Sequence, residues 1–201
     1  MSRLSERAEV IAKALLARNP VSEAFFARES DRLAEACREM SGRFEDGGRL
    51  LAFGHAQSAT DAQHISVEFI HPVIVGKRAL PALDLSLAFN DWVPAVARPR
   101  DIAFGFTDAA GDADVARVLA ALGKTGVQTI GIAGTGAAFS FEPPSGDPFI
   151  DQEIIEVLYH TLWESVHVFF EHSEMGHDVG EAGFLYPYLG REKQNTDALV
   201  A

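Results

Sequence analysis

The sequence predicts an α/β fold built on a parallel, doubly wound sheet, and three observations support this prediction. Short apolar, strand-like runs alternate with helical segments along residues 48–171. Two of these runs, GRLLAFG at 48–54 and VQTIGIAG at 127–134, end in glycine turns. The first of them leads directly into a helical segment. This arrangement is typical of a parallel sheet whose ligand crevice lies at the carboxyl ends of the strands.

Two further helices are predicted in front of this core, at residues 4–17 and 22–43, joined by the sequence RNPV. Their apolar side chains recur at helical spacing, at Val10, Ile11, Leu15, Leu16, Phe25, Phe26, Leu33, Ala36 and Met40. An α/β core that begins near residue 48 needs fewer helices than this to cover it. The surplus apolar faces predict self-association, as a homotetramer or a dimer.

The remaining elements follow in order along the chain. Strands are predicted at 48–54, 80–86, 101–106 and 127–134, and helices at 58–70, 112–123 and about 150–171. Residues 1–172 are expected to form one domain. From residue 173 the chain is punctuated by glycine and carries the aromatic run FLYPYL at 184–189. We interpret residues 173–201 as a partly flexible arm that docks through that run.

Composition narrows the class of protein. A chain of 201 residues with 47% hydrophobic residues is long and apolar enough for one globular domain. The net charge of −12 argues against nucleic acid or an anionic membrane as a partner, because both would be repelled. The single cysteine, Cys37, allows no intrachain disulfide and is predicted to be a buried structural thiol. No apolar run approaches ~18 residues, so we expect a cytoplasmic enzyme or binding domain without a membrane span.

The turn and helix after the first strand carry the first candidate site. In GHAQSATDAQHISVEF at 54–69, His64 and Glu68 are four residues apart and share one helix face. An imidazole and a carboxylate at this spacing suit a divalent metal, and they equally suit a general acid–base pair. A solvated pair on the helix surface is the third interpretation.

The long late helix carries a second set of polar side chains. Gln152, Glu156 and His160 fall at i, i+4 and i+8, roughly on one face. If this helix faces the helix at 58–70, His64, Glu68 and His160 form a four-ligand site with either Gln152 or Glu156. The sequence leaves that choice open, because eight residues span about 12 Å of helix.

These two segments resemble the sugar isomerase (SIS) domains, most closely the bacterial phosphoheptose isomerases. The first glycine loop and helix match at Gly54, Ser58, Ala59, Asp61, Ala62, Gln63, His64 and Glu68, and depart at His55, Ala56 and Gln57. The late motif IDQEIIEVLYH matches at Gln152, Glu153 and His160. The two preceding helices and the sequence Asn90-Asp91-Trp92 also fit, so the resemblance spans roughly residues 5–171. It implies a three-layer SIS sandwich.

The resemblance also implies a chemistry. In phosphoheptose isomerases the positions of His64, Glu68, Gln152 and His160 form a metal site, often occupied by zinc. The positions of Glu68 and His160 are the base and acid that move a proton between two sugar carbons through an enediol. Such a pair can remove a proton next to a carbonyl and protonate the developing oxyanion. Glu156 departs from the family, where this position is usually apolar.

The turn that holds phosphate in the family is altered. Its usual pattern is S-T-S-G-N-S, and residues 107–112 read TDAAGD, so Thr107 remains while Asp108 and Asp112 replace hydroxyl residues. Two carboxylates would repel a dianionic phosphate, although Asp112 also suits a helix cap. The segment at 85–100 is shorter than in the family. Candidate contacts to a sugar-like substrate are His55, Gln57, Ser58, Asp61, Thr107, Asp108 and Asp112.

Two hypotheses follow for function. The first is a metal-dependent aldose–ketose isomerase, or a related enzyme, whose recognition of phosphate has been lost. The second is a catalytically silent SIS protein that serves in binding or assembly. The presence of Glu68 and His160 favours the enzyme, because a silent scaffold needs no acid–base pair.

Overall fold

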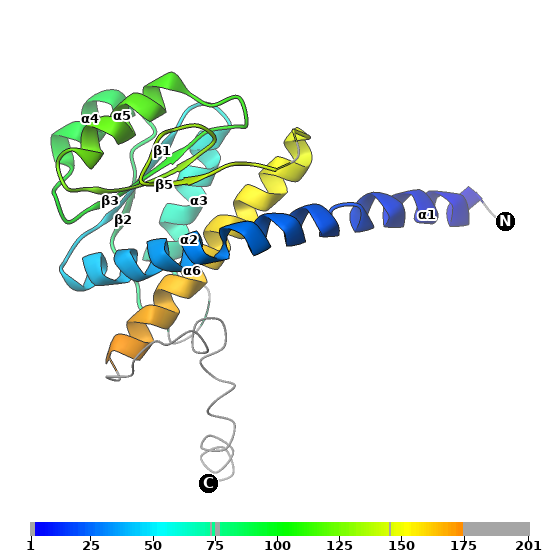
Figure 1. Cartoon of the computed structure of the whole chain (residues 1–201), viewed down its shortest axis with the longest axis horizontal. Coiled ribbons are helices and arrows are strands. Elements are labelled where there is room, and N and C mark those ends of the chain that lie inside the picture. The colour runs from blue at the N-terminus through cyan, green and yellow to red at the C-terminus, as the bar shows by residue number, and fades with distance from the viewer. Residues whose placement is uncertain (1–2, 73, 75–76, 145, 175–201) are drawn as a thin grey trace, which may run out of the picture.

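The computed structural model describes residues 3–72, 74, 77–144 and 146–174, and confirms the predicted α/β class. Five parallel strands form one sheet in the order β2-β1-β3-β4-β5 (Figure 1). The strands are β1 Leu50–Gly54, β2 Ala82–Asp84, β3 Ile102–Phe106, β4 Gln128–Ile132 and β5 Phe139–Phe141. The helices are α1 Arg3–Leu16, α2 Asn19–Glu45, α3 Ser58–Ile70, α4 Phe89–Val96, α5 Ala113–Gly123 and α6 Pro148–Glu174. The aromatic run at 184–189 lies outside the described residues.

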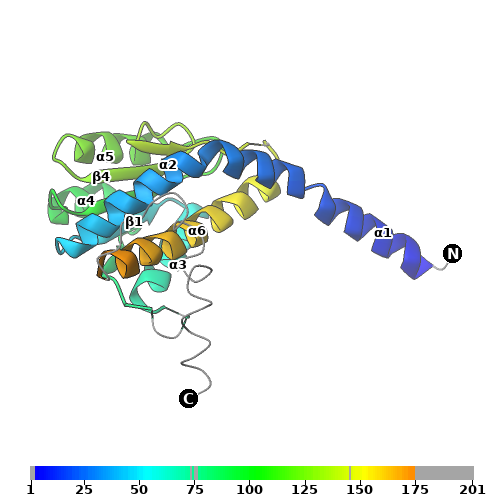
Figure 2. The ribbon, with the colours of Figure 1, turned by 60° about the horizontal axis from the view of Figure 1, so that its bottom comes forward.

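The molecule has three layers. Helices α2, α3 and α6 cover one face of the sheet, while α4 and α5 cover the other (Figure 2). Alternate residues along each strand serve the two faces, as pleating requires: Leu50 and Ala52 of β1 pack toward α2, α3 and α6, and Leu51 and Phe53 pack toward α4 and α5. The three central strands are buried along their whole length. A sheet covered on both faces explains why these strands read as continuous apolar runs.

Helices α1 and α2 follow each other as one bent helix. The break falls at Ala17–Arg18, and α2 begins at Asn19, earlier than predicted, because Pro20 fits the first turn of a helix. Helix α2 packs against α6 in the core, and Cys37 is fully buried there, as predicted. Helix α1 instead projects away from the domain (Figures 1 and 2). Its side chains Val10, Ile11, Leu15 and Leu16 are 59–70% exposed.

The order of the strands places a crevice between β1 and β3. The chain leaves β1 toward β2 at one side of the sheet, then returns to pair β3 on the other side of β1. Ligands of open α/β sheets bind where the connections diverge in this way, outside the carboxyl ends of the strands. The turns after Gly54 and after Phe106 therefore meet at one edge.

Two short elements, α4 and β5, did not follow from the sequence. Strand β5 has three residues, too few for alternation to be recognised. Helix α4 has eight residues and contains Pro94, which is unusual inside a helix. Among the described helices none combines the length and apolar character required to cross a bilayer.

Close packing of β3 against α5 gives a test of this architecture. A Cβ atom at Gly105 would lie 2.6 Å from Val115 Cγ1 and 2.8 Å from Leu119 Cδ1. Because both contacts are with buried side chains, Gly105→Ala should lower the free energy of unfolding by about 1–3 kcal/mol in urea denaturation. The control is Gly123→Ala, where the nearest atoms are 3.9 Å away and a change within about 1 kcal/mol is expected. Equal stability of the two variants would contradict this packing.

Candidate active site

Helices α3 and α6 bring the two sequence motifs together. His64 and Glu68 of α3 and His160 of α6 each place a ligand-type atom within 4.8 Å of the others. His64 Nε2 lies 3.5 Å from Glu68 Oε1. The His64 side chain is 46% exposed and the Glu68 side chain 13%, so the cluster opens to solvent on one side. The arrangement places two imidazoles and a carboxylate around a common point, which suits either a metal or proton transfer.

Tyr159 orients His64, although no pattern in the sequence singled out this tyrosine. Its hydroxyl lies 2.9 Å from His64 Nδ1. The ring is buried, packing edge-on against Phe106. Burial raises the pKa of Tyr159, and the nearby carboxylates of Asp61, Glu156 and Glu68 raise it further, so the phenol stays neutral. A bond at Nδ1 turns the other ring nitrogen, Nε2, toward Glu68 and His160.

The second imidazole is held by its own helix. His160 Nδ1 lies 2.7 Å from the carbonyl oxygen of Glu156, one turn earlier. A carbonyl oxygen can only accept, so Nδ1 carries the proton, and Nε2 of the neutral ring has the lone pair. One turn further on, Trp163 Nε1 donates to the backbone carbonyl of Glu68 at 2.8 Å. Helix α6 thus fixes both its own histidine and the backbone that carries Glu68.

Gln152, in the first turns of α6, lies next to two carboxylates. Its Nε2 donates to Asp61 Oδ1 at 2.8 Å, and Glu156 Oε1 is 3.5 Å away. The amide nitrogen is therefore already used as a hydrogen-bond donor, and the side-chain carbonyl oxygen of Gln152 is the atom that could bind a metal. Among the described residues, Glu156 is not within the 4.8 Å cluster of His64, Glu68 and His160.

Asp61 is buried and accepts the hydrogen bond from Gln152. It does not line the pocket at the carboxyl ends of β1 and β3. Burial raises its pKa to about 6; the hydrogen bond from Gln152 opposes this shift, and the negative charge of Glu156 adds to it. Its hydrogen bond positions the Gln152 amide. The predicted contact between Asp61 and a substrate stays a prediction.

A separate pocket lies at the carboxyl ends of β1 and β3. Its volume is about 340 Å³, and its lining residues are His55, Ala56, Gln57, Ser58, Phe106, Thr107, Asp108, Gly111 and Asp112. The structure thus gathers every predicted substrate contact except Asp61 into one place. The two turns that form it come from adjacent parallel strands, paired at Gly54 and Phe106.

Asp112 occupies the N-terminus of α5 at this pocket. Its Oδ1 accepts from the backbone N–H groups of Asp114 and Val115, at 2.8 and 3.1 Å. Its Oδ2 lies 2.7 Å from His55 Nδ1. Burial would raise the pKa of Asp112, but the bonds from His55 and the two amides outweigh it, and the pKa is lowered. The helix-cap role is confirmed, and the same carboxylate also pairs with His55.

The other members of the altered turn are also engaged within the chain. Asp108 Oδ1 accepts from Ala110 N at 2.9 Å, and the Thr107 hydroxyl donates to the carbonyl oxygen of Ile132 at 3.0 Å. The His55 ring packs on Phe89 with centroids 4.5 Å apart. The donors at the start of α5 are therefore already directed at a carboxylate of the protein itself.

Comparison with solved structures identifies the fold. The structure of a phosphoheptose isomerase from Francisella tularensis matches with a TM-score of 0.67 and 19% identity, over 83% of this chain and 99% of that chain. The phosphoheptose isomerase from Neisseria gonorrhoeae matches with a TM-score of 0.67 and 18% identity, over 79% of this chain and 98% of that chain. The fold is that of the SIS isomerases, as the sequence predicted.

Sequence comparison then identifies the family. The phosphoheptose isomerase of Synechocystis is 30% identical over 148 residues, which cover 62% of this chain and 76% of that protein. The phosphoheptose isomerase of Desulfovibrio desulfuricans is 32% identical over 130 residues, or 57% of this chain and 62% of that protein. No protein-family model matches the sequence. The chain belongs to the phosphoheptose isomerase family.

Proposed function

We propose that this protein is a metal-dependent aldose–ketose isomerase that acts on a sugar-like substrate without using the phosphate site of its relatives. The observation that carries the proposal is the convergence of His64, Glu68 and His160 from two helices. Relatives named phosphoheptose isomerase support the reaction class. The altered turn at 107–112 supports the change in substrate.

The donor set fits a divalent metal, most simply zinc. Two imidazole nitrogens, one carboxylate and an amide oxygen provide the nitrogen and oxygen ligands that zinc accepts. His64, Glu68 and His160 would hold it, with Gln152 as the fourth ligand that the family resemblance implies and the neighbouring Glu156 as the alternative. A bound ion would supply positive charge next to the carbonyl of the substrate.

The acid and base would come from the same cluster. The Glu68 carboxylate would take the proton from the carbon next to the carbonyl. His160, when its Nε2 carries a proton and does not bind the ion, would give that proton to the carbonyl oxygen, which yields an enediol. Glu68 would then return its proton to the former carbonyl carbon while the hydroxyl on the neighbouring carbon gives its proton back to His160, which completes the exchange of aldose and ketose. The bonds at Tyr159 and at the Glu156 carbonyl keep the two imidazoles oriented for this work.

The pocket at 55–58 and 107–112 would hold the other end of the substrate. A phosphate there would compete with the Asp112 carboxylate for the α5 amides and would face Asp108. A neutral hydroxyl or a cationic group meets no such repulsion. We therefore infer that the substrate carries no phosphate at this end.

A silent binding or assembly protein is the second candidate, and the occupied anion site is the observation that favours it. The hydrogen-bonded orientation of both imidazoles favours the enzyme instead. Zinc binding without turnover of any sugar, with or without phosphate, would decide for the silent protein.

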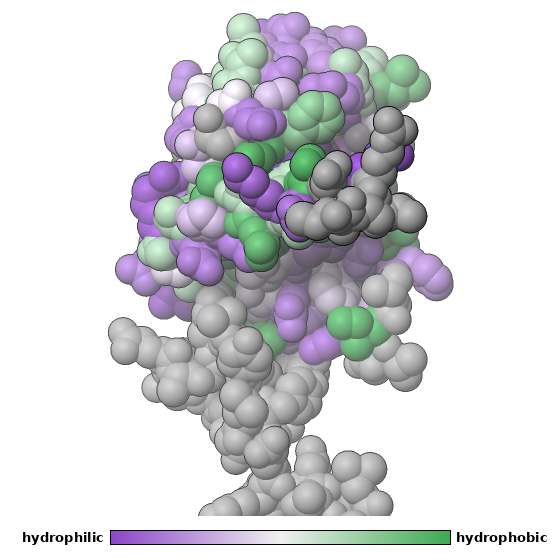
Figure 3. Space-filling model, turned by 90° about the vertical axis from the view of Figure 1, so that its right-hand side faces the viewer, coloured by the Kyte–Doolittle hydropathy of each residue, from purple (hydrophilic) through white to green (hydrophobic). Residues whose placement is uncertain are grey.

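We also propose that α1 mediates self-association, as a homotetramer or a dimer. Its apolar side chains are exposed to solvent among the residues that the structure describes; Figure 3, seen from the side toward which α1 points, shows apolar and hydrophilic residues mixed on this face. Light scattering at micromolar concentration should show an oligomer, and Ile11→Glu with Leu15→Glu should dissociate it because burying carboxylates is unfavourable. Replacing Glu9 and Lys13 by Gln is the control. A stable wild-type monomer would contradict this.

Metal binding can be tested with single substitutions on α3 in the full chain. The wild-type protein should bind about one zinc ion per chain, and His64→Ala should lower the affinity for zinc at least about tenfold. Removing a residue that only hydrogen-bonds to a metal ligand typically costs ~10–100-fold in metal affinity, and removing a ligand should cost no less. His71→Ala is the matched control, because His71 lies at the C-cap of the same helix and outside the cluster. Metal analysis and competition with a chelator give the affinities. Substoichiometric zinc in the wild-type protein would overturn the metal site.

Substrate charge is tested at the altered turn. The wild-type protein should not isomerise sedoheptulose 7-phosphate, and Asp108→Thr with Asp112→Ser should bind sugar phosphates about tenfold more tightly, equivalent to about 1.4 kcal/mol. Serine still caps a helix, so α5 is expected to remain intact. The control is Asp31→Ser, which removes an exposed acidic side chain of α2, outside the pocket. Efficient turnover of the heptose phosphate by the wild-type protein would refute the proposed substrate.

A further inference from the structure

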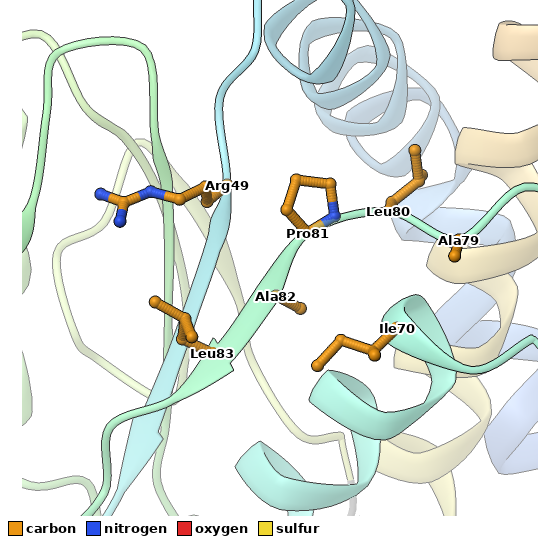
Figure 4. A pocket seen from close by; sticks show the side chains of 7 residues that line it. All are labelled: Arg49, Ile70, Ala79, Leu80, Pro81, Ala82 and Leu83. Carbon is orange, nitrogen blue, oxygen red and sulfur yellow. The ribbon is translucent and has the colours of Figure 1, made fainter.

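An apolar groove lies at the edge of the sheet, away from the candidate active site. Its volume is about 510 Å³, and it is lined by Ile70 of α3, the run Ala79–Leu83 and Arg49 (Figure 4). Ile70 and Leu83 are 49% and 40% exposed. Val67 and Ile74 near them on the chain are exposed as well. Arg49 is engaged by Asp101 at 2.6 Å, so it adds no free charge to the groove.

The groove borders a strand edge. Strand β2 ends the sheet among the described strands, pairing with β1 on one side. Figure 4 shows Pro81 and Ala82 leading into this strand, with Ile70 on the neighbouring helix. Exposed apolar side chains beside a strand edge favour aggregation unless another segment covers them.

The end of α6 is attached to the segment that forms the groove. His167 Nε2 lies 2.9 Å from the carbonyl oxygen of Arg78. The Arg78 guanidinium lies over the Phe170 ring, 5.3 Å from its centroid. Since Ala79 follows Arg78 directly, the last turns of α6 lie beside the start of the groove.

The chain continues from this point with a segment of suitable composition. Residues 175–201 follow Glu174, and their apolar run is FLYPYL at 184–189. The nine residues 175–183 between them can span up to about 30 Å. The last turns of α6 contact Arg78, which precedes the first residue of the groove, so a segment of this length can reach it. Aromatic rings bury a large apolar area, and Pro187 suits an extended segment at a strand edge.

We propose that residues 184–189 of the same chain dock in the groove formed by Ile70 and Ala79–Leu83. The docked run covers the edge of β2 and the exposed apolar side chains of α3. Docking within one chain is favoured because only nine residues must be closed into a loop, and the entropic cost of closing a loop of this length is small.

The first test is hydrogen exchange of the full chain. Phe184→Ser with Leu185→Ser should speed amide exchange in residues 79–84 at least about tenfold, because the covering segment leaves. Exchange in α5, on the opposite face of the sheet, should stay the same and serves as the internal control. Unchanged exchange at 79–84 would overturn the proposal.

The second test identifies the chain that occupies the groove. Cys37 is buried and its pKa is raised by burial, so engineered cysteines can be oxidised without it. Leu83→Cys paired with Leu185→Cys or with Leu189→Cys should form a disulfide within one chain. Ala121→Cys on α5, paired with the same positions, should not. Disulfides only between chains would assign the groove to a second copy and overturn the proposal, as would the absence of an intrachain product with both pairs.

Discussion

The packing of α3 against α6 is the contact on which the candidate site depends. The two halves of the site lie about ninety residues apart in sequence, and three hydrogen bonds join them: Gln152 to Asp61, Tyr159 to His64 and Trp163 to the Glu68 carbonyl. The last two use the polar tip of an aromatic side chain whose body is buried in the core. The contacts that build the core therefore also set the direction of the imidazole and the carboxylate.

Helix α3 connects this cluster to the pocket at the sheet edge. Its N-terminus carries Ser58, which lines the pocket, and its middle carries His64 and Glu68. At ~1.5 Å per residue, Ser58 and His64 are about 9 Å apart along the axis, which is comparable with the length of a sugar chain. One rigid helix thus fixes the separation between the proposed reacting end of the substrate and the end that is only recognised.

The sequence predicted the order of the main elements because its central strands are buried on both faces and its helices are amphipathic. The i,i+4 spacing of His64 and Glu68 indicated one half of the site, whereas its pairing with His160 was predicted only on the condition that the two helices face each other, which local spacing cannot establish. Tyr159 was missed because a tyrosine in an apolar helix is indistinguishable by pattern from a core residue. Only the tertiary structure brings its hydroxyl next to the imidazole of His64. The position of Asp61 under Gln152 depends on the same contact between helices. Short elements such as β5 carry too few residues for any pattern.

The departures from the family in the two turns act on each other. Asp112 brings a carboxylate to the start of α5, where amides would otherwise face an external anion, and His55 brings the matching imidazole from the other turn. Without His55, Asp112 would still accept from the two amides, but its second oxygen would lose the imidazole. Without Asp112, the His55 ring would lose this hydrogen-bond partner. The hydrogen bond between them therefore joins the two turns across the pocket. That pair leaves the cluster of His64, Glu68 and His160 intact, so the proposed change concerns the recognised end of the substrate and not the chemistry at the reacting end.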